Sequence, residues 1–239
     1  MKYSNHAAII ASTLALSGTA HSAVIIDDFS TDTSANYTGE NSFGSGGSFS
    51  VSGGNLNIVA QRNNTYGVFH NTALLGVGEQ LTATIPVGTN QFRLTISEGG
   101  TAGPLNGKPS STNEGIRYFI NGPTDFRVFD TTAGSETPIG TANEPGAAWS
   151  GDIDLVIRRM TSTTYEMGWD TGSGFTSTGY TATLGGDGTI ATPTAMFIGA
   201  EAFGSTKTVS AFEITAIPEP SSYALLSLGG LALMLFRRR

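Results

Sequence analysis

The groups most able to do chemistry in this sequence are carboxylates, since the 239 residues include no cysteine and only three histidines. Two acid pairs have spacings that a strand would place on one face: Asp152 with Asp154, and Glu166 with Asp170. Retaining glycoside hydrolysis needs two carboxyl groups roughly 5–5.5 Å apart. Neither pair has further acids in register, so we interpret both as ordinary exposed acids near strand ends.

The sequence contains few residues that could form a nucleophilic catalytic site or bind zinc. His70 is the only histidine after residue 23, and no Gly-x-Ser-x-Gly elbow occurs anywhere. A zinc site would have one histidine and no cysteine to use. The absence of cysteine also excludes a thiol nucleophile and a disulfide scaffold. The sequence therefore predicts a protein that is not an enzyme.

Calcium is the one cation that the carboxylate side chains could coordinate. Asp27, Asp28 and Asp32 lie near the start of the body, and Glu201 and Glu213 lie near its end. First and last strands of a sandwich are often neighbours, so these oxygens could meet, and hard oxygen ligands suit calcium. We take Asp27, Asp28 and Glu213 as the candidate ligands, with solvent-exposed acids as the alternative interpretation.

Glycan binding would use aromatic rings on a concave face or a loop. Trp149 falls in a predicted loop and Trp169 ends a predicted strand, and these two are our candidate glycan contacts. Tyr118 and Phe119 should face opposite sides of one strand. Burial in the core is the competing explanation for each of these rings.

Short alternating or β-branched runs separated by Gly, Asn and Asp turns dominate the body and predict strands. No run predicts a helix there, and two stretches, 99–115 and 131–148, read as long strandless loops. The predicted strands are residues 24–29, 48–51, 56–60, 66–70, 80–86, 91–97, 116–121, 126–130, 153–160, 164–169, 195–200 and 210–215. A dozen strands at this spacing predict an all-β, two-sheet antiparallel sandwich of the jelly-roll type.

Charge and the N-terminus bear on where the protein works. Charged residues make up only 13% of the chain, and the body, 24–216, carries eight basic against eighteen acidic side chains, a net of −10. That acidity disfavours nucleic acid and is compatible with neutral glycans and cations. Residues 1–23 have a lysine, a short apolar run and small residues, which is typical of a secretory signal peptide.

The C-terminal segment, 217–239, combines three features in a fixed order. Pro218, Glu219 and Pro220 precede 16 residues without a charge, 221–236, and the chain then closes on Arg237, Arg238 and Arg239. As a helix the apolar run would be about 24 Å long, slightly short of a ~30 Å hydrocarbon core, with the arginines as a cytoplasmic stop. The triplet, the apolar run and the basic end resemble the PEP-CTERM sorting signal.

That resemblance implies export, transient inner-membrane anchoring by the apolar helix, and processing by an exosortase-type protease. It also implies delivery to the cell surface or to an exopolysaccharide matrix. Proteins with this signal have widely differing bodies, so the resemblance implies routing and leaves the activity of residues 24–216 open.

The body resembles concanavalin A-like lectin and glucanase domains. The resemblance rests on Asp27-Asp28-Phe29-Ser30, on residues 49–56, on residues 153–159 with 164–166, and on the closing residues 197–201 and 209–215. It implies two stacked antiparallel sheets that often meet glycans. Laminarinase-type members carry an E-x-D-x-x-E strand of catalytic acids, which this sequence lacks.

We therefore expect an exported surface or matrix protein that is structural or glycan-associated and not an enzyme. Two alternatives remain open from the sequence. One is a secreted glycan-binding adhesin, which would share the location and add a ligand. The other is a glycan hydrolase or lyase of the same fold, which would need paired acids on a concave strand.

Overall fold

The computed structural model describes most of the body of the chain. The described residues are 25–43, 45–60, 64–72, 74–86, 89, 92–97, 115–120, 126–132, 135–142, 151–183, 195–202 and 206–217. The predicted signal peptide, the sorting segment from Pro218 onward, Trp149 and nearly all of the loop predicted at 99–115 lie outside these residues. None of the described segments is an apolar helix long enough to cross a membrane.

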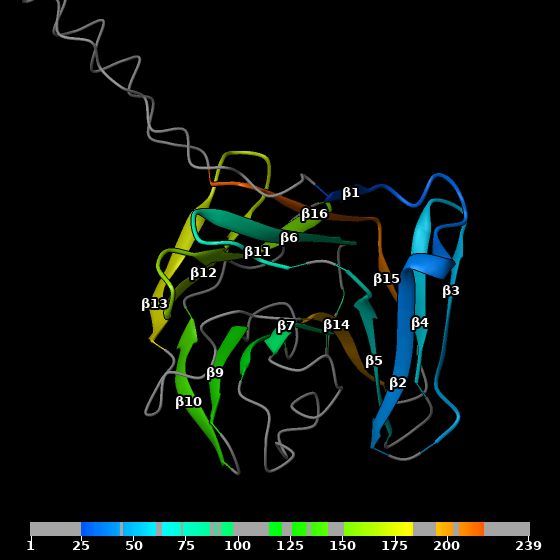
Figure 1. Cartoon of the computed structure of the whole chain (residues 1–239), viewed down its shortest axis with the longest axis horizontal. Helices are drawn as coiled ribbons and strands as arrows, with labels where there is room; N and C mark the ends of the chain where they lie inside the picture. The colour runs from blue at the N-terminus through cyan, green and yellow to red at the C-terminus, as the bar shows by residue number, and fades with distance from the viewer. Residues whose placement is uncertain are drawn as a thin grey trace, which may run out of the picture.

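Six strands form the upper sheet in Figure 1. In spatial order they are β1 (Ile25–Asp27), β16 (Ala211–Ala216), β6 (Glu79–Ile85), β11 (Ile153–Arg159), β12 (Thr164–Asp170) and β13 (Thr176–Thr183). Every pairing is antiparallel, and the first strand of the body lies against the last, with Ile25 opposite Ile214. The sequence expectation that the two ends of the body are neighbours is confirmed.

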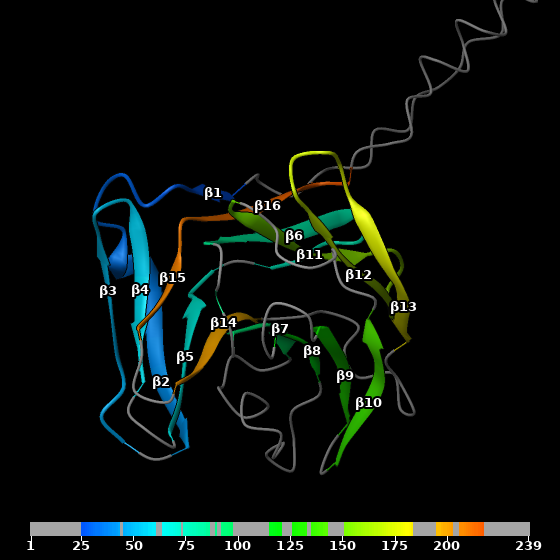
Figure 2. The ribbon, with the colours of Figure 1, turned by 180° about the vertical axis from the view of Figure 1, so that it is seen from behind.

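Seven strands form the lower sheet. Their order is β10 (Ser135–Ala142), β9 (Phe126–Thr132), β8 (Gly115–Ile120), β7 (Phe92–Ser97), β14 (Ala195–Ala202), β5 (Asn64–His70) and β2 (Tyr37–Phe43). A third sheet of β15 (Thr206–Val209), β4 (Asn55–Val59) and β3 (Ser48–Ser52) stands beside β2, and a single 3-10 turn, η1 (Ser34–Asn36), leads into β2. Figure 2 shows the same layers from behind.

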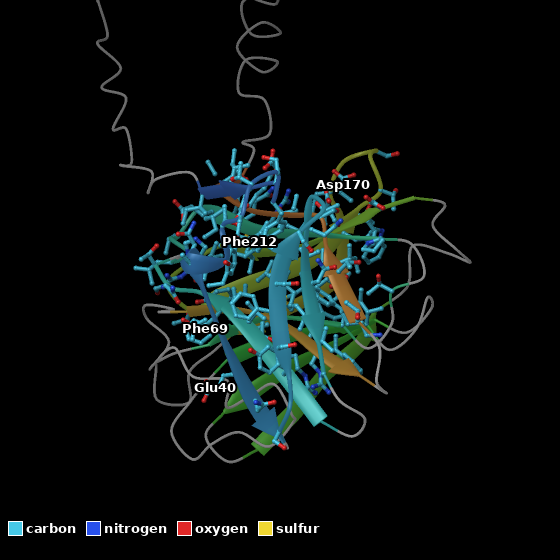
Figure 3. The ribbon with its side chains drawn as sticks, turned by 90° about the vertical axis from the view of Figure 1, so that its right-hand side faces the viewer. Glu40, Phe69, Asp170 and Phe212 are labelled. Atoms are coloured by element: carbon cyan, nitrogen blue, oxygen red, sulfur yellow. The ribbon has the colours of Figure 1, made fainter. Side chains whose placement is uncertain are left out.

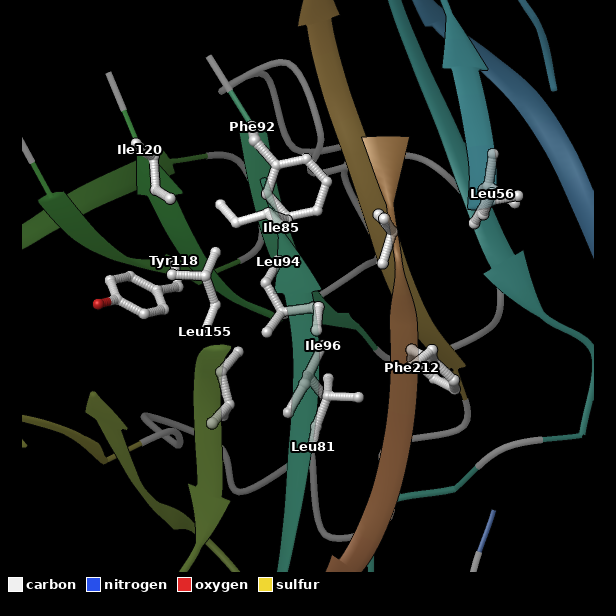
Figure 4. Packing of buried hydrophobic residues seen from close by; sticks show 14 of the residues in the cluster. Leu56, Leu81, Ile85, Phe92, Leu94, Ile96, Tyr118, Ile120, Leu155 and Phe212 are labelled. Atoms are coloured by element: carbon white, nitrogen blue, oxygen red, sulfur yellow. The ribbon is translucent and has the colours of Figure 1, made fainter. Parts of the chain in front are cut away.

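The core lies between the two large sheets because alternate residues of each strand face inward. Leu81, Ile85 and Leu155 of the upper sheet face Leu94 and Ile96 of the lower sheet (Figure 4). All five side chains are fully buried. Because the chain contains no cysteine, this apolar layer contributes to stability without help from disulfides.

The predicted all-β antiparallel sandwich is confirmed, and all twelve predicted strands are present. The third sheet was not predicted, and four further strands, β2, β10, β13 and β15, were missed. The interpretation of residues 131–148 as strandless is wrong, since β10 occupies residues 135–142. Pro138 and Gly140 lie at a register irregularity of β10, which is an edge strand. Proline is tolerated there because an edge strand has no second neighbouring strand to which its missing N–H would have to donate.

Candidate functional site

The outer face of the lower sheet carries two arginines on its central strands. In β7 and β8 the residues Leu94, Ile96, Ile116 and Tyr118 belong to the core cluster. The residues between them therefore point to the opposite face. We call this set, Arg93, Thr95, Arg117 and Phe119, the Arg–Phe layer. The predicted opposite facings of Tyr118 and Phe119 are confirmed, because Tyr118 lies in the core and Phe119 lies in this layer.

Stacking holds the Arg–Phe layer together. The guanidinium carbon of Arg93 lies 4.8 Å from the centre of the Phe119 ring, and that of Arg117 lies 5.8 Å from it. Arg93 is paired in register with Phe119, and Thr95 with Arg117. Arg93 and Arg117 are each 4% exposed, so both are buried although they lie on the face of the sheet opposite the core. Two cations held around one ring, on a face that the core does not use, form a base suited to anionic or planar ligands.

A row of small residues extends from the layer toward the edge of the sheet. Arg93 pairs with Gly199 of β14, Gly199 pairs with Gly67 of β5, and Gly67 pairs with Glu40 of β2. Two adjacent positions between Glu40 and Arg93 therefore carry no side chain. Phe69, half-buried on β5, and Glu40, exposed on β2, are labelled in Figure 3. At about 4.8 Å per strand, Glu40 and Arg93 are roughly 14 Å apart across the sheet.

Thr95 adds a polar group to the layer. Its side chain is fully buried, and its hydroxyl makes no hydrogen bond in the structure. A buried hydroxyl without a partner is uncommon because the lost hydration is not replaced. The position lies directly opposite Arg117. The layer thus combines two buried guanidinium groups, an aromatic ring and one hydroxyl without a hydrogen bond.

A second buried polar cluster lies where β1, η1, β2, β5 and β16 meet, and we call it the Asp27 corner. One carboxylate oxygen of Asp27 accepts the Phe29 backbone N–H at 2.9 Å. The other accepts the Thr33 hydroxyl at 2.7 Å and the Tyr37 hydroxyl at 2.9 Å. Phe29 has a positive φ of 54°, which a non-glycine residue rarely adopts, and the bond from its N–H to Asp27 helps to hold it.

Aromatic contacts complete the Asp27 corner. The Tyr37 ring meets His70 edge-on at 5.1 Å, and His70 stacks on Phe212 at 6.0 Å. Nδ1 of His70 accepts the Thr72 backbone N–H at 3.3 Å. Burial raises the pKa of the Tyr37 hydroxyl, and the Asp27 charge raises it further. Burial also lowers the pKa of His70, although Asp27 opposes that shift. His70 is therefore a neutral, packed residue here.

The structure separates the three candidate calcium ligands. Asp27 pairs with Phe212, whose side chain lies in the core, whereas Glu213 pairs with the exposed Ile26. Because strand side chains alternate, Asp27 and Glu213 point to opposite faces of the sheet. Asp28 is exposed, and its carboxylate accepts the Ser30 backbone N–H. The described residues contain no group of three potential metal ligands. Calcium binding stays an untested prediction.

Asp154 and Asp170 form the acid pair that the strand register creates. They lie directly opposite each other on β11 and β12, on the outer face of the upper sheet. Asp154 accepts the Thr84 hydroxyl at 2.6 Å, and Asp170 accepts the backbone N–H groups of Gly172 and Gly174. Burial raises the pKa of Asp154, the Thr84 hydrogen bond lowers it, and the charges of Asp170 and Asp152 raise it. Sequence spacing paired Asp152 with Asp154 and Glu166 with Asp170, and only tertiary pairing joins Asp154 to Asp170.

Trp169 lies in the core cluster, 6% exposed. Packing therefore accounts for this ring, which was a candidate glycan contact. The other candidate, Trp149, lies outside the described residues. Sequence reasoning missed the Arg–Phe layer because it counted arginines only toward net charge. The signal was present in the alternation of Arg117 and Phe119 with core residues on one strand.

The sequence comparisons identify the tail. Residues 216–239 match the family model described as the PEP-CTERM protein-sorting motif. No curated protein matches the chain. The match confirms the sorting signal expected at Pro218, Glu219 and Pro220, and the motif implies an exported protein sorted to the cell surface.

Solved structures share the fold of the body. The exoplasmic/lumenal domain of VIP36 with Ca²⁺ and Man3GlcNAc has a TM-score of 0.56 at 9% identity, covering 77% of this chain and 84% of that one. A Bacillus subtilis protein of unknown function with a galectin-like fold has a TM-score of 0.55 at 10% identity, with 80% and 94% covered. A prokaryotic β-1,3-1,4-glucanase (lichenase) derived from a mouse hindgut metagenome has a TM-score of 0.54 at 12% identity, covering 81% of this chain and 99% of that one. The predicted concanavalin A-like sandwich is confirmed as a fold, and these neighbours include both a protein solved with a bound glycan and an enzyme.

Proposed function

We propose that this chain is an exported, non-enzymatic glycan-binding protein of the cell surface or extracellular matrix. In this proposal the tail anchors the precursor transiently in the inner membrane, and an exosortase-type protease then removes it. The body, in turn, binds the exopolysaccharide of the matrix. The sorting motif at residues 216–239 supports the routing, and the lectin-type fold supports a glycan ligand.

The Arg–Phe layer is the observation that carries the binding part of the proposal. Guanidinium groups recognise carboxylates through a planar fork of donors, and aromatic rings stack on sugar faces. Gly67 and Gly199 carry no side chain that would separate a flat ligand from the backbone between Glu40 and Arg93. The two arginines favour sugars that carry carboxylate groups, and this local preference must exceed the repulsion that the body's net charge of −10 exerts on a polyanion.

The routing is tested in cells that process such tails. Pro218, Glu219 and Pro220 are replaced together by alanine, and the mass and the location of the protein are followed. We expect unprocessed precursor in the membrane fraction. Unchanged mass and unchanged release to the surface would contradict the routing.

Binding is tested on the secreted form of the protein, with a polyuronate such as alginate beside a neutral β-glucan. Retention is measured by affinity electrophoresis in gels containing each polymer. We expect retardation in the polyuronate gel above that in the neutral gel. Equal mobility in both gels and in a gel without polymer would contradict glycan binding by this protein.

A hydrolase is the second candidate, and the Asp154–Asp170 pair is the observation that favours it. Residues directly opposite in an antiparallel pair have Cβ atoms about 4.5–5.5 Å apart, which is compatible with a retaining mechanism. Both carboxylates are held by structural hydrogen bonds on the outer face of the upper sheet, so we rank this function second. Turnover of soluble β-glucan that disappears in both Asp154→Asn and Asp170→Asn would establish it.

A further inference from the structure

One end of the upper sheet carries no charged side chain and exposes three large hydrophobic ones, and the last described residue, Ile217, lies at this end. We call it the tail-side rim and define it as residues 74–78, 160–164 and 216–217. Leu74, Val77 and Met160 are 53%, 56% and 45% exposed. Only two other large hydrophobic side chains in the described residues, Ile26 and Val59, are exposed, and neither belongs to the rim. Single exposed hydrophobics are ordinary, but three in adjoining segments mark a contact surface.

Backbone and arginine hydrogen bonds bring the rim segments together. The Gly78 N–H donates to the Arg159 carbonyl at 2.8 Å, and the Ile217 N–H donates to the Gly78 carbonyl at 2.8 Å. The Arg159 guanidinium also donates to the Leu75 carbonyl at 2.8 Å and to the Ser162 carbonyl at 3.0 Å. The two segments that carry exposed apolar side chains are thus fixed to each other and to the last described residue.

The charge distribution along the upper sheet is one-sided. Residues 74–78, 160–164 and 216–217 contain no charged side chain, and the adjoining Glu79 and Arg159 are buried. The opposite end of the same strands carries Asp152, Asp154 and Asp170. An acidic end is repelled by the anionic lipids of a membrane surface, whereas a neutral apolar end is not.

The length of the tether fixes how far the rim can lie from whatever holds the tail. Four residue steps separate Ile217 from Ser221, where the uncharged run begins. At 3.3–3.6 Å per residue they span at most about 14 Å. The headgroup layer on each side of a bilayer is roughly 5–8 Å thick. If residues 221–236 enter the hydrocarbon, the rim must lie against the headgroup layer or within about 9 Å of it.

We propose that the tail-side rim docks on the lipid bilayer while the precursor is anchored, with Val77, Met160 and Leu74 in the interfacial layer. Burial of these side chains among headgroups and upper acyl chains removes apolar surface from water. Docking orients the domain so that its acidic end points away from the membrane. This inference rests on the proposed anchoring by the tail. It adds an orienting contact made by the folded domain itself.

The test uses the full chain, which contains no cysteine and so accepts a single label at a chosen position. Val77→Cys and Met160→Cys are labelled with an environment-sensitive fluorophore and reconstituted into phosphatidylethanolamine–phosphatidylglycerol vesicles. Ser50→Cys is the matched control, an exposed position on β3. Figures 1 and 2 show β3 on the far side of the molecule from the end of β16. Quenching by lipids brominated near the headgroup is measured at each position, after flotation has separated vesicle-bound protein.

We expect several-fold stronger quenching and a blue-shifted emission at residues 77 and 160 compared with residue 50. Floated protein with equal quenching at all three positions would overturn the docking and leave the anchoring intact. Protein that does not float would overturn the anchoring and the docking together. If the labels become shielded only after the processing protease is added, the rim contacts that protein and not the lipid. This result would also overturn the proposal. Matching unfolding temperatures for the labelled variants and the unmodified chain check that the fold is retained.

Discussion

The Asp27 corner and the Arg–Phe layer are both buried and polar, yet they are built in opposite ways. In the corner, one carboxylate receives three donors from residues within ten positions along the chain, and the surrounding rings belong to the core or pack on it. In the layer, two cations from neighbouring strands share one phenyl ring on a face away from the core, and the Thr95 hydroxyl is left without a hydrogen bond. The Asp27 carboxylate receives all its donors within the corner, whereas the layer leaves one buried hydroxyl, that of Thr95, without a hydrogen bond.

This difference separates a structural cluster from a candidate binding face. A buried network whose donors and acceptors are matched stabilises the fold, and breaking one member leaves the others unsatisfied. Cations gathered on an outer face add little to folding, because desolvation offsets their attraction to partners. The two clusters should therefore respond differently to substitution, in stability for the corner and in ligand binding for the layer.

The largest effect is expected for Asp27→Ala. The change removes three hydrogen bonds and leaves the buried Tyr37 hydroxyl without its acceptor, so we expect a loss of about 3–4 kcal/mol in the free energy of unfolding. Urea denaturation measures it. Asp28→Ala is the matched control, since Asp28 is exposed and bonds only to its own turn, and it should change stability by less than about 0.5 kcal/mol. Equal effects of the two substitutions would contradict the structural role of the corner.

The next effect concerns binding. Arg93→Gln combined with Arg117→Gln should weaken retention by polyuronate at least about tenfold, because each guanidinium offers charge-assisted hydrogen bonds to a carboxylate. Arg158→Gln is the control. Arg158 also stacks on a phenyl ring, with its guanidinium carbon 3.4 Å from the centre of Phe175, but it lies on the outer face of the upper sheet. Similar losses in both variants would mean that the layer is not the binding face.

A smaller effect should appear as acid sensitivity of the corner. Burial lowers the pKa of His70 below its usual 6.5, so the unfolded chain takes up its proton first as pH falls. The stability from neutral His70 is thus fully present above about pH 6.5 and declines as the pH falls below it. His70→Gln should flatten the dependence of unfolding temperature on pH between about 7.5 and 5.5. An unchanged slope would assign the sensitivity to another group.

The smallest effect is expected at the acid pair. Folding raises the pKa of Asp154, so the folded protein binds a proton at this carboxyl more tightly than the unfolded chain does. The free energy of unfolding therefore increases as the pH falls below that raised pKa. At neutral pH Asp154→Asn should therefore be neutral or stabilising by about 0.5 kcal/mol, a modest figure because the group is half exposed. Thr84→Val, which removes the hydrogen bond to Asp154, should not stabilise. A clear destabilisation by Asp154→Asn would show that the charged form is needed.

The four strands that sequence reasoning missed have a common position. β2 and β10 are the two edges of the lower sheet, β13 is an edge of the upper sheet, and β15 is an edge of the third sheet. An edge strand pairs on one side only and buries less, so its side chains need not alternate between apolar and polar. β13, with the sequence Thr-Ser-Thr-Gly-Tyr-Thr-Ala-Thr, shows how little alternation such a strand requires.

The same limit applies to the candidate site. The sequence indicated which residues were acidic, aromatic or basic. Its period-two pattern also predicted correctly that Phe119 and Tyr118 point to opposite faces of the sheet. It could not join Asp154 to Asp170 or Arg93 to Phe119, because these pairs depend on which strands become neighbours and in which register. Spacing along one strand suggested Asp152 with Asp154, whereas the pairing of β11 with β12 places Asp154 directly opposite Asp170.

The sequence by itself determined the all-β class, the central strands and the sorting tail, because each is encoded in contiguous residues: alternation within a strand, or a triplet, an apolar run and a basic end. Tertiary structure alone decided that Asp27 and Glu213 lie on opposite faces, that two arginines share one ring, and that the apolar rim lies where the tail departs. These features come from residues 24 or more positions apart in the chain. Only the packing and register of the sheets bring such residues together, since long-range strand pairing is set by the whole core and not by any local segment.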